Sequence, residues 1–123
     1  MVTSGLVTTI AGSPYQSPGH DDGVGAFASF NHPLGVAMDP AGTFALVTDQ
    51  SNNLLRRINL TSTFVSTVAG SLVGIPNSNY GHADGTGTIA SFNNPAGVAM
   101  DASSKFAVIV SAERQVSSSV ANC

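Results

Sequence analysis

The chain has 123 residues, of which 42% are hydrophobic and only 9% are charged, and its formal net charge is −3. The 4 Lys and Arg residues are too few to form the clustered cations that bind nucleic acid or an anionic membrane surface. No apolar run approaches the ~20 residues that span a bilayer. The single cysteine, Cys123, allows no internal disulfide and no cysteine-based metal site.

The predicted elements are short strands separated by turns rich in Gly, Pro and Asn, a pattern that is typical of all-β proteins. In chain order they span residues 7–11, 34–38, 44–48, 54–60 and 64–69. The short connections between the last four predict an antiparallel meander. The strand at 44–48 begins FALV and is apolar on both faces, so we expect both of its faces to be buried.

The sequence then repeats itself. Residues 20–49 and 82–111 agree at 16 of 30 positions without gaps, and VTTIAG at 7–12 recurs as VSTVAG at 65–70. The first match has an offset of 62 and the second an offset of 58. Because insertions in repeat proteins map to loops, this difference predicts an insertion of four residues in the loop before His82.

The second unit becomes divergent toward its C-terminal end. Two clear strands lie between residues 96 and 110, and a third is expected at 116–120. In this third strand the serines at 117–119 align with Leu-Arg-Arg at 55–57, so the pattern of the first unit is weakened there.

The order of the motifs FNxPxGVAMD, FALVTD, SNNLLRRI and VSTVAG resembles the NHL repeat, a four-stranded blade of a β-propeller. The resemblance extends from Val7 to about Ser111. It departs from the family pattern at residues 52–54, which read Asn-Asn-Leu where the family has Asn-His-Leu.

This resemblance divides the chain into three parts. Residues 1–12 would hold the last strand of a preceding blade, residues 13–70 a linker and a complete blade, and residues 71–123 a linker and a partial second blade with a divergent C-terminal end. The expected fold is all-β, with antiparallel four-stranded, NHL-like blades in an incomplete propeller. Because each blade buries its faces only against its neighbours, such a piece leaves two blade faces uncovered.

The linkers at residues 13–32 and 71–94 are the candidate binding loops. Both join an outer strand to the next inner strand, so they are expected on one face of the propeller, and loops on a rigid scaffold are where binding tends to occur. The residues expected on this face are Tyr15, His20, Asp22, Tyr80, His82 and Asp84. Plain solvent-exposed loops are the alternative interpretation.

The linkers predict no metal, cofactor or catalytic centre. His20 and His82 occupy equivalent positions in neighbouring blades, so their side chains are expected to lie apart. A metal centre needs its ligands close together. The motifs DDG at 21–23 and DGTG at 84–87 lack the closing glutamate of a calcium loop, because the one glutamate, Glu113, is far from both. No spacing predicts a Ser–His–Asp triad or a catalytic pair of carboxylates.

The remaining recurrent residues have structural interpretations. Phe30 and Phe92 recur within the motif ASFN and are expected to be buried wedges between blades. Asp39, Asp49 and Asp101 lie at strand ends, where we expect them to cap turns.

The predicted function is a non-catalytic scaffold that binds a protein or a glycan. Two alternatives stay open: a remnant of a propeller enzyme of the lyase or lactonase type, and a two-blade unit that self-associates through its open blade faces. In the second, three copies would close a six-bladed ring, with residues 7–11 of one chain completing the second blade of its neighbour. The glycosylation sequon at Asn59 and the low charge favour an extracellular setting, although the N-terminus lacks the features of a secretory signal.

Overall fold

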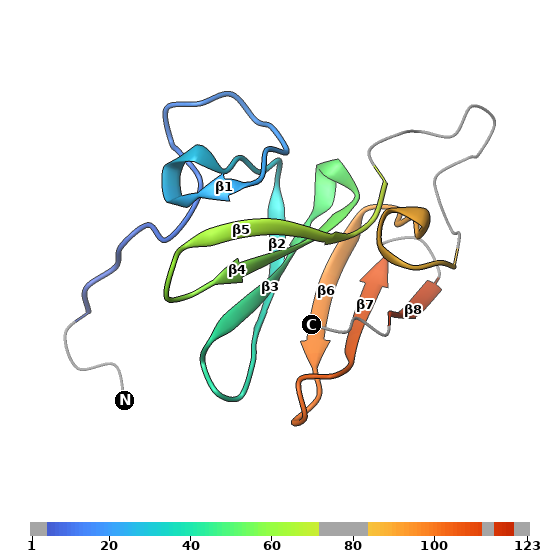
Figure 1. Ribbon diagram of the computed structural model, residues 1–123. Helices are drawn as coiled ribbons and strands as arrows, with labels where there is room; N and C mark the ends of the chain where they lie inside the picture. The colour runs from blue at the N-terminus through green and yellow to red at the C-terminus, as the bar shows by residue number, and fades with distance from the viewer. Residues whose placement is uncertain (1–4, 72–83, 112–114, 120–123) are drawn as a thin grey trace.

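The computed structural model describes residues 5–71, 84–111 and 115–119 (Figure 1). Within these ranges the chain forms two antiparallel sheets, one with the strand order β1-β5-β4-β3-β2 and one with the order β6-β7-β8. The strands are β1 (Gly23–Val24), β2 (Pro33–Met38), β3 (Phe44–Asp49), β4 (Leu54–Asn59), β5 (Phe64–Ala69), β6 (Pro95–Met100), β7 (Ala107–Ser111) and β8 (Gln115–Ser119). Three short 3-10 helices accompany them: η1 (Gly25–Phe27), η2 (Gln50–Asn52) and η3 (Gly87–Ile89).

The predicted all-β blade is confirmed. Strands β2 to β5 form the expected meander, and their bounds differ from the prediction by one residue at most. All six residues of β3 are buried, as its two apolar faces predicted. The two-residue strand β1 was not predicted; it pairs with the outer edge of β5 and fixes the linker there.

Residues 7–11, predicted as the last strand of a preceding blade, form no strand among the described residues. A strand needs a neighbouring strand to bond its backbone N–H and C=O groups, and no described segment pairs with these residues in a sheet. Val7 is accordingly 92% exposed. The end of this segment nevertheless matches the end of β5, because Gly12 N donates to Gly25 O (3.1 Å) as Gly70 N donates to Gly87 O (3.2 Å).

Strand β8 lies one residue earlier than predicted, and its register differs from the sequence alignment. Ser117 pairs with Ile109, as Arg56 pairs with Val47 in the first sheet. Ser117 therefore takes the register position of Arg56 and not that of Leu55. The reason is that three residues separate β7 from β8, whereas four separate β3 from β4.

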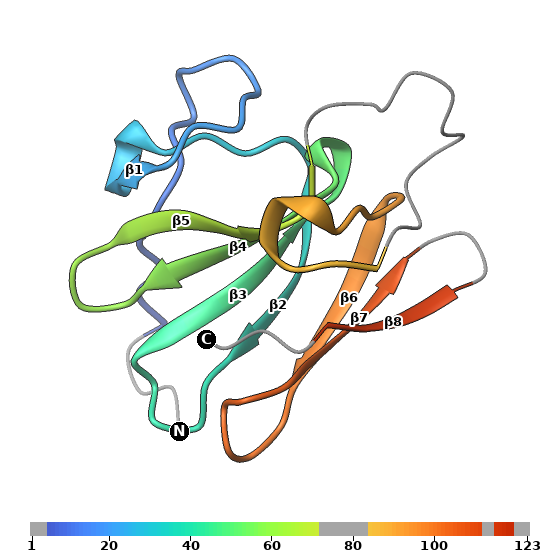
Figure 2. The same cartoon turned by 45° about the vertical axis from the view of Figure 1, so that its right-hand side comes forward.

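The two sheets stand side by side, with β2 next to β6 (Figure 2). The Thr48 hydroxyl bridges them by donating to Ala96 O (2.9 Å). The backbones come so close that a Cβ added at Gly35 would lie 2.4 Å from Ala96 O, so a side chain at this position would force the sheets apart. The core fills the space between the sheets and consists of Phe44, Leu46, Leu55, Ala69, Phe92, Ala107 and Ile109.

Phe92 is the wedge that the sequence predicted. It is 4% exposed and packs against residues from both sheets. Its repeat equivalent, Phe30, is only half-buried, because it lies on the side of the first sheet that faces away from the second.

Asp39 and Asp101 cap equivalent turns, as predicted. Asp39 accepts hydrogen bonds from the backbone of Ala41, Thr43 and Phe44. Desolvation raises the pKa of Asp39, but these hydrogen bonds outweigh it and hold the pKa below its ordinary value. Asp101 occupies the same place in the second sheet.

The carboxylate of Asp101 accepts hydrogen bonds from the Ser103 hydroxyl and from the N–H groups of Ser103, Lys105 and Phe106. These bonds lower the pKa of Asp101 from its ordinary value of 3.8 to about 2. The bond from the Ser103 hydroxyl has the largest effect, and the bond from the Phe106 N–H has the next largest.

Replacing the wedge should show which aromatic ring holds the sheets together. We expect Phe92→Ala to lower the free energy of unfolding by about 3–5 kcal/mol, as for other fully buried phenylalanines. Phe30→Ala should cost less than half as much, because its ring is only half-buried. Urea unfolding followed by circular dichroism measures both. Equal losses would contradict the role of Phe92 as the inter-sheet wedge.

Protonation of Asp101 should account for part of the loss of folding stability in acid. The pKa of Asp101 is lower in the folded chain than its ordinary value of 3.8. Its contribution to the free energy of unfolding is therefore complete above pH 4 and is lost as the pH falls from about 4 toward about 2. The difference in unfolding free energy between the wild type and Asp101→Asn should therefore shrink over this interval. A difference that stays constant between pH 5 and pH 2 would contradict the assignment.

Candidate functional site

The first linker is held in place by one buried side chain, Arg56 of β4, which is fully buried. Its Nη1 donates to Asp49 Oδ2 (2.9 Å) and to the backbone oxygen of Ser29 (3.0 Å). Its Nη2 donates to Asp22 Oδ1 (2.8 Å) and to the backbone oxygen of Asp21 (2.9 Å). One guanidinium therefore fixes the linker at three positions against the sheet.

Asp49, at the end of β3, is the buried partner of Arg56, with no exposed side-chain surface. The Asp49 carboxylate also accepts hydrogen bonds from Asn31 N (2.7 Å) and Asn52 Nδ2 (2.8 Å). The Phe30 ring covers the guanidinium, with 5.1 Å between the ring centroid and Arg56 Cζ. The prediction that Asp49 only caps a turn was therefore incomplete. An arginine directly after two leucines in a strand, seven residues after an aspartate, was the signal for an ion pair.

Asp22 was predicted as a binding-face residue, and in the structure it also holds the linker against the sheet. It is half-exposed, and its carboxylate accepts hydrogen bonds from Thr67 N (3.1 Å) and the Thr67 hydroxyl (3.0 Å) in addition to the Arg56 ion pair. Asp22 thus ties the linker to β5 while one side of its carboxyl group still faces solvent.

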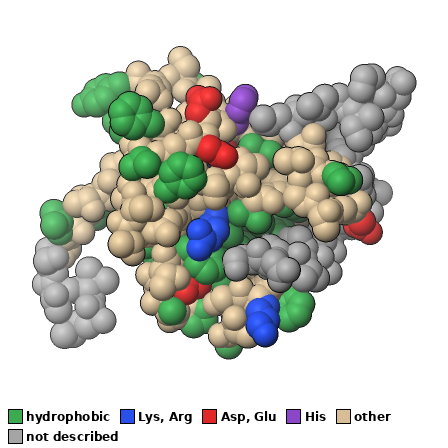
Figure 3. Space-filling view, viewed as in Figure 1, with side chains coloured by type: hydrophobic (Ala, Val, Ile, Leu, Met, Phe, Trp, Pro, Cys, Tyr) green, Lys and Arg blue, Asp and Glu red, His purple; other side chains and the backbone are tan. Residues whose placement is uncertain are grey.

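A pocket of about 430 Å³ opens beside Asp22, between the two linkers. His20 and Asp21 come from the first linker, Thr67 from β5, and Thr88 from η3 in the second linker. The remaining lining residues are Leu54, Gly70 and Ser71. Figure 3 shows acidic side chains and a histidine side chain gathered on the upper part of the molecule. We call this the linker pocket.

The structure brings together two of the six predicted binding-face residues, His20 and Asp22. Tyr15 is 94% exposed and does not line the linker pocket, and neither does the exposed Asp84. Tyr80 and His82 lie outside the described residues.

Sequence reasoning missed Thr67 and Thr88, which line the pocket. A threonine in a strand and another in a Gly-rich linker carry no sequence signal that marks them for binding.

Asn59, the predicted glycosylation acceptor, ends β4 and is partly exposed. Its side-chain oxygen accepts hydrogen bonds from Thr61 N (2.9 Å) and Ser62 N (2.9 Å). This places the sequon in the turn between β4 and β5 (Figure 1).

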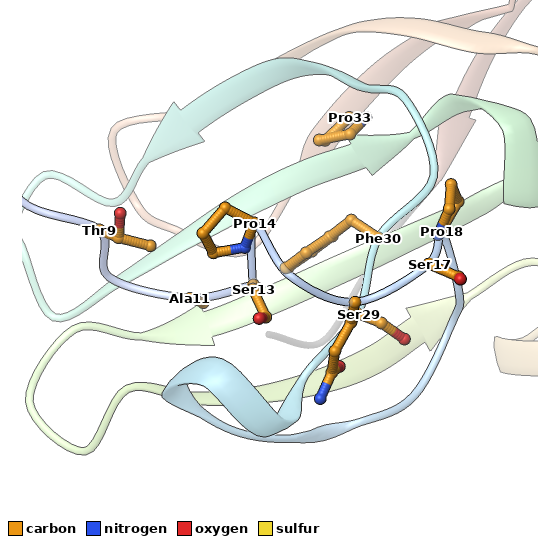
Figure 4. Close-up of a pocket in the computed structure, with 11 residues that line it drawn as sticks. Thr9, Ala11, Ser13, Pro14, Ser17, Pro18, Ser29, Phe30 and Pro33 are labelled. Carbon is orange, nitrogen blue, oxygen red and sulfur yellow. The ribbon is translucent and has the colours of Figure 1, made fainter.

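A second pocket, of about 330 Å³, lies beside Phe30. Figure 4 shows the Phe30 ring between Pro14 and Pro33, next to the segment that carries Thr9 and Ala11. The side chains around it are mostly small or apolar, so this pocket offers contact area and few charged groups.

The described residues contain no group of three His, Cys, Asp or Glu side chains that could hold a metal ion. Within the same part of the chain, no helix is long and apolar enough to cross a membrane.

The Arg56 ion pair should be strongly coupled. Arg56→Ser alone leaves the carboxylate of Asp49 buried without its cationic partner, which should cost about 3–5 kcal/mol of unfolding free energy. The double variant Asp49→Ser/Arg56→Ser should lose clearly less than the sum of the two single changes. The control pair Arg56→Ser/Asp101→Ser, whose sites share no partner, should be additive within about 0.5 kcal/mol. Urea unfolding gives all these values, and additivity in the first pair would contradict the coupling.

No protein-family model matches the sequence. Two curated relatives do: NHL repeat-containing protein 2 of Bos taurus is 40% identical over 67 residues, and the protein of the same name from Homo sapiens is 39% identical over 67 residues. Each match covers 54% of this chain and 9% of the relative, so the chain corresponds to a small part of those proteins.

Solved structures resemble the fold over most of the chain. A structural genomics protein of unknown function from Bacteroides thetaiotaomicron has a TM-score of 0.70 and 28% identity, covering 86% of this chain and 25% of its own. An auxiliary nutrient binding protein from Bacteroides ovatus has a TM-score of 0.64 and 25% identity, covering 81% of this chain and 25% of its own. With the meander of strands β2 to β5 and the recurrent motifs, these similarities lead to one conclusion: the chain has the fold of a β-propeller segment with NHL-like blades, and its sequence is similar to that of NHL repeat-containing proteins.

Proposed function

We propose that this segment is a non-catalytic interaction scaffold whose linker pocket binds a protein partner through a cationic side chain. The observation that carries the proposal is the meeting of two linkers from neighbouring blades at one pocket, with His20 and Asp21 on one side and Thr88 on the other.

The scaffold behind the pocket is rigid. The buried Arg56 network fixes the first linker, and β1 adds backbone pairing to β5. A preformed surface loses little conformational entropy when it binds, which favours affinity.

The charge of the site selects the partner. The carboxylates of Asp22 and Asp49 pair with Arg56, and Asp21 adds a third carboxyl group at the pocket, so the cluster has more formal negative than positive charge. A lysine or arginine side chain would complement this charge, and the hydroxyl groups of Thr67 and Thr88 could accept further hydrogen bonds. Among the described residues that line the pocket there is no Phe, Tyr or Trp ring to stack on a sugar, so this lining favours a protein over a glycan.

The non-catalytic part of the proposal is supported by the innermost strands. In β2 the exposed side chains are Pro33, Leu34, Val36 and Met38, and β6 repeats the motif GVAM. Such side chains supply neither a nucleophile nor a general base.

The proposal can be tested by adding tetralysine peptide to the ¹⁵N-labelled chain and following backbone amide shifts by NMR. Shifts should concentrate at His20, Asp21, Thr67 and Thr88, and should weaken as salt is added. Asp21→Asn should raise the Kd about two- to five-fold, as expected for one exposed charge pair.

The matched control is Asp84→Asn, which removes an equal charge outside the pocket and should leave the Kd unchanged. Equal effects of the two variants, or shifts that avoid the pocket, would contradict the proposal. Maltotetraose in place of tetralysine tests the glycan alternative, and shifts at the pocket with maltotetraose alone would replace the protein by a glycan as the ligand.

A further inference from the structure

The turn between β4 and β5 contains the only Asn-Xaa-Ser/Thr triplet of the sequence, Asn59-Leu60-Thr61. Such a triplet is the acceptor motif for N-linked glycans when its middle residue is not proline. Whether the folded chain can carry a sugar there depends on how the asparagine side chain is used in the fold. It also depends on whether the side-chain nitrogen reaches solvent.

The side-chain oxygen of Asn59 closes this turn. Oδ1 accepts hydrogen bonds from Thr61 N (2.9 Å) and from Ser62 N (2.9 Å), as is typical of an asparagine that caps a turn. Leu60 N donates to Thr43 O (2.9 Å), which ties the turn to the residue before β3. The two residues that the acceptor motif requires, Asn59 and Thr61, are therefore held together in one fixed turn.

The side-chain nitrogen of Asn59 takes no part in the turn. No described residue accepts a hydrogen bond from Nδ2. In the described part of the chain, the buried polar side-chain atoms without a partner are Nε of Arg56 and Nε of Arg57, so Nδ2 is not one of them. Nδ2 therefore reaches solvent, next to the exposed residues Thr61 and Ser62. A sugar attached to Nδ2 leaves Oδ1 and its two hydrogen bonds in place.

Two other turns show that a cap of this kind does not require asparagine. Asp39 and Asp101 accept a hydrogen bond from the backbone N–H two residues on, in the turns that follow β2 and β6. A carboxylate has no amide nitrogen to which a glycan can be linked. Of these three capping residues, Asn59 is the one that both closes its turn and presents such a nitrogen.

We propose that Asn59 is an N-glycosylation site of this chain, modified when the chain enters a secretory compartment. The donor is an oligosaccharide that is linked to a lipid through pyrophosphate. The bond from C1 of the first sugar to the pyrophosphate oxygen breaks as the bond from Nδ2 to C1 forms. The lipid pyrophosphate leaves, and the proton that Nδ2 loses passes to a base of the transferase enzyme.

The glycan site and the linker pocket lie toward opposite ends of β5. The turn with Asn59 precedes Phe64, the first residue of β5, whereas Thr67 and Gly70 line the pocket. At the rise of an extended strand, the chain from Phe64 to Gly70 spans about 20 Å. Figures 1 and 2 both show the turn at the end of the β4–β5 hairpin, away from the second sheet. The inference is therefore independent of the proposed function.

The experiment is expression of the chain behind a cleavable secretory signal in eukaryotic cells, followed by treatment of the secreted product with a glycan-releasing amidase. The wild type should lose the mass of one glycan on treatment. Because the amidase converts the linked asparagine to aspartate, peptide mass spectrometry should then find aspartate at position 59. A secreted wild type without a glycan would overturn the proposal.

Asn59→Asp is the matched variant, because its carboxylate keeps a cap for the N–H groups of Thr61 and Ser62 while the amide nitrogen is removed. It should be secreted, keep the β-sheet signal in circular dichroism, and show no change of mass with the amidase. Thr61→Ala should also be unmodified, whereas Thr61→Ser should keep the glycan, because the motif needs a hydroxyl group there. A glycan on Asn59→Asp or on Thr61→Ala would overturn the proposal.

If the cells retain the chain, translation in vitro in the presence of microsomes gives the answer. A chain that has entered the microsomes is protected from added protease, and the protected wild type should lose mass on amidase treatment. A protected wild type whose mass does not change would overturn the proposal.

Discussion

The Arg56 guanidinium, buried between the first sheet and its linker, fixes most of what distinguishes this blade. It connects β3 through Asp49, the linker through Ser29 and Asp21, and the solvent-facing edge through Asp22. A charge without exposed surface is tolerated only when partners replace the water it has lost, and here two carboxylates and two backbone oxygens do so. The linker conformation follows from this demand, since the guanidinium needs those oxygens where the linker supplies them.

The second unit shows what happens when this pair is absent. Ser111 takes the place of Asp49, since it pairs with Pro95 as Asp49 pairs with Pro33, and Ser117 takes the register position of Arg56. The cation and its buried partner have thus been replaced together. Loss of one partner alone would leave a buried charge without compensation, whereas loss of both removes the desolvation cost as well as the attraction. The acid that persists in the second unit, Asp84, is exposed.

The linker pocket and the second pocket, beside Phe30, both adjoin the same network. Asp22 and Asp21 line the pocket from the side that Arg56 holds, and Phe30 covers the guanidinium from the other side. Two pockets are thus supported by one buried cation.

The sequence by itself determined the local features: the strands, the turns capped by Asp39 and Asp101, the buried β3 and the wedge at Phe92. Each rests on interactions among near neighbours or on a repeat that the residues display directly. Only the tertiary structure decided that Asp49 pairs with Arg56, that Thr67 and Thr88 share a pocket with His20, and that residues 7–11 form no strand. The physical reason is that ion pairs, pockets and ladders join residues distant in the chain, and their formation depends on which partner lies within reach in space.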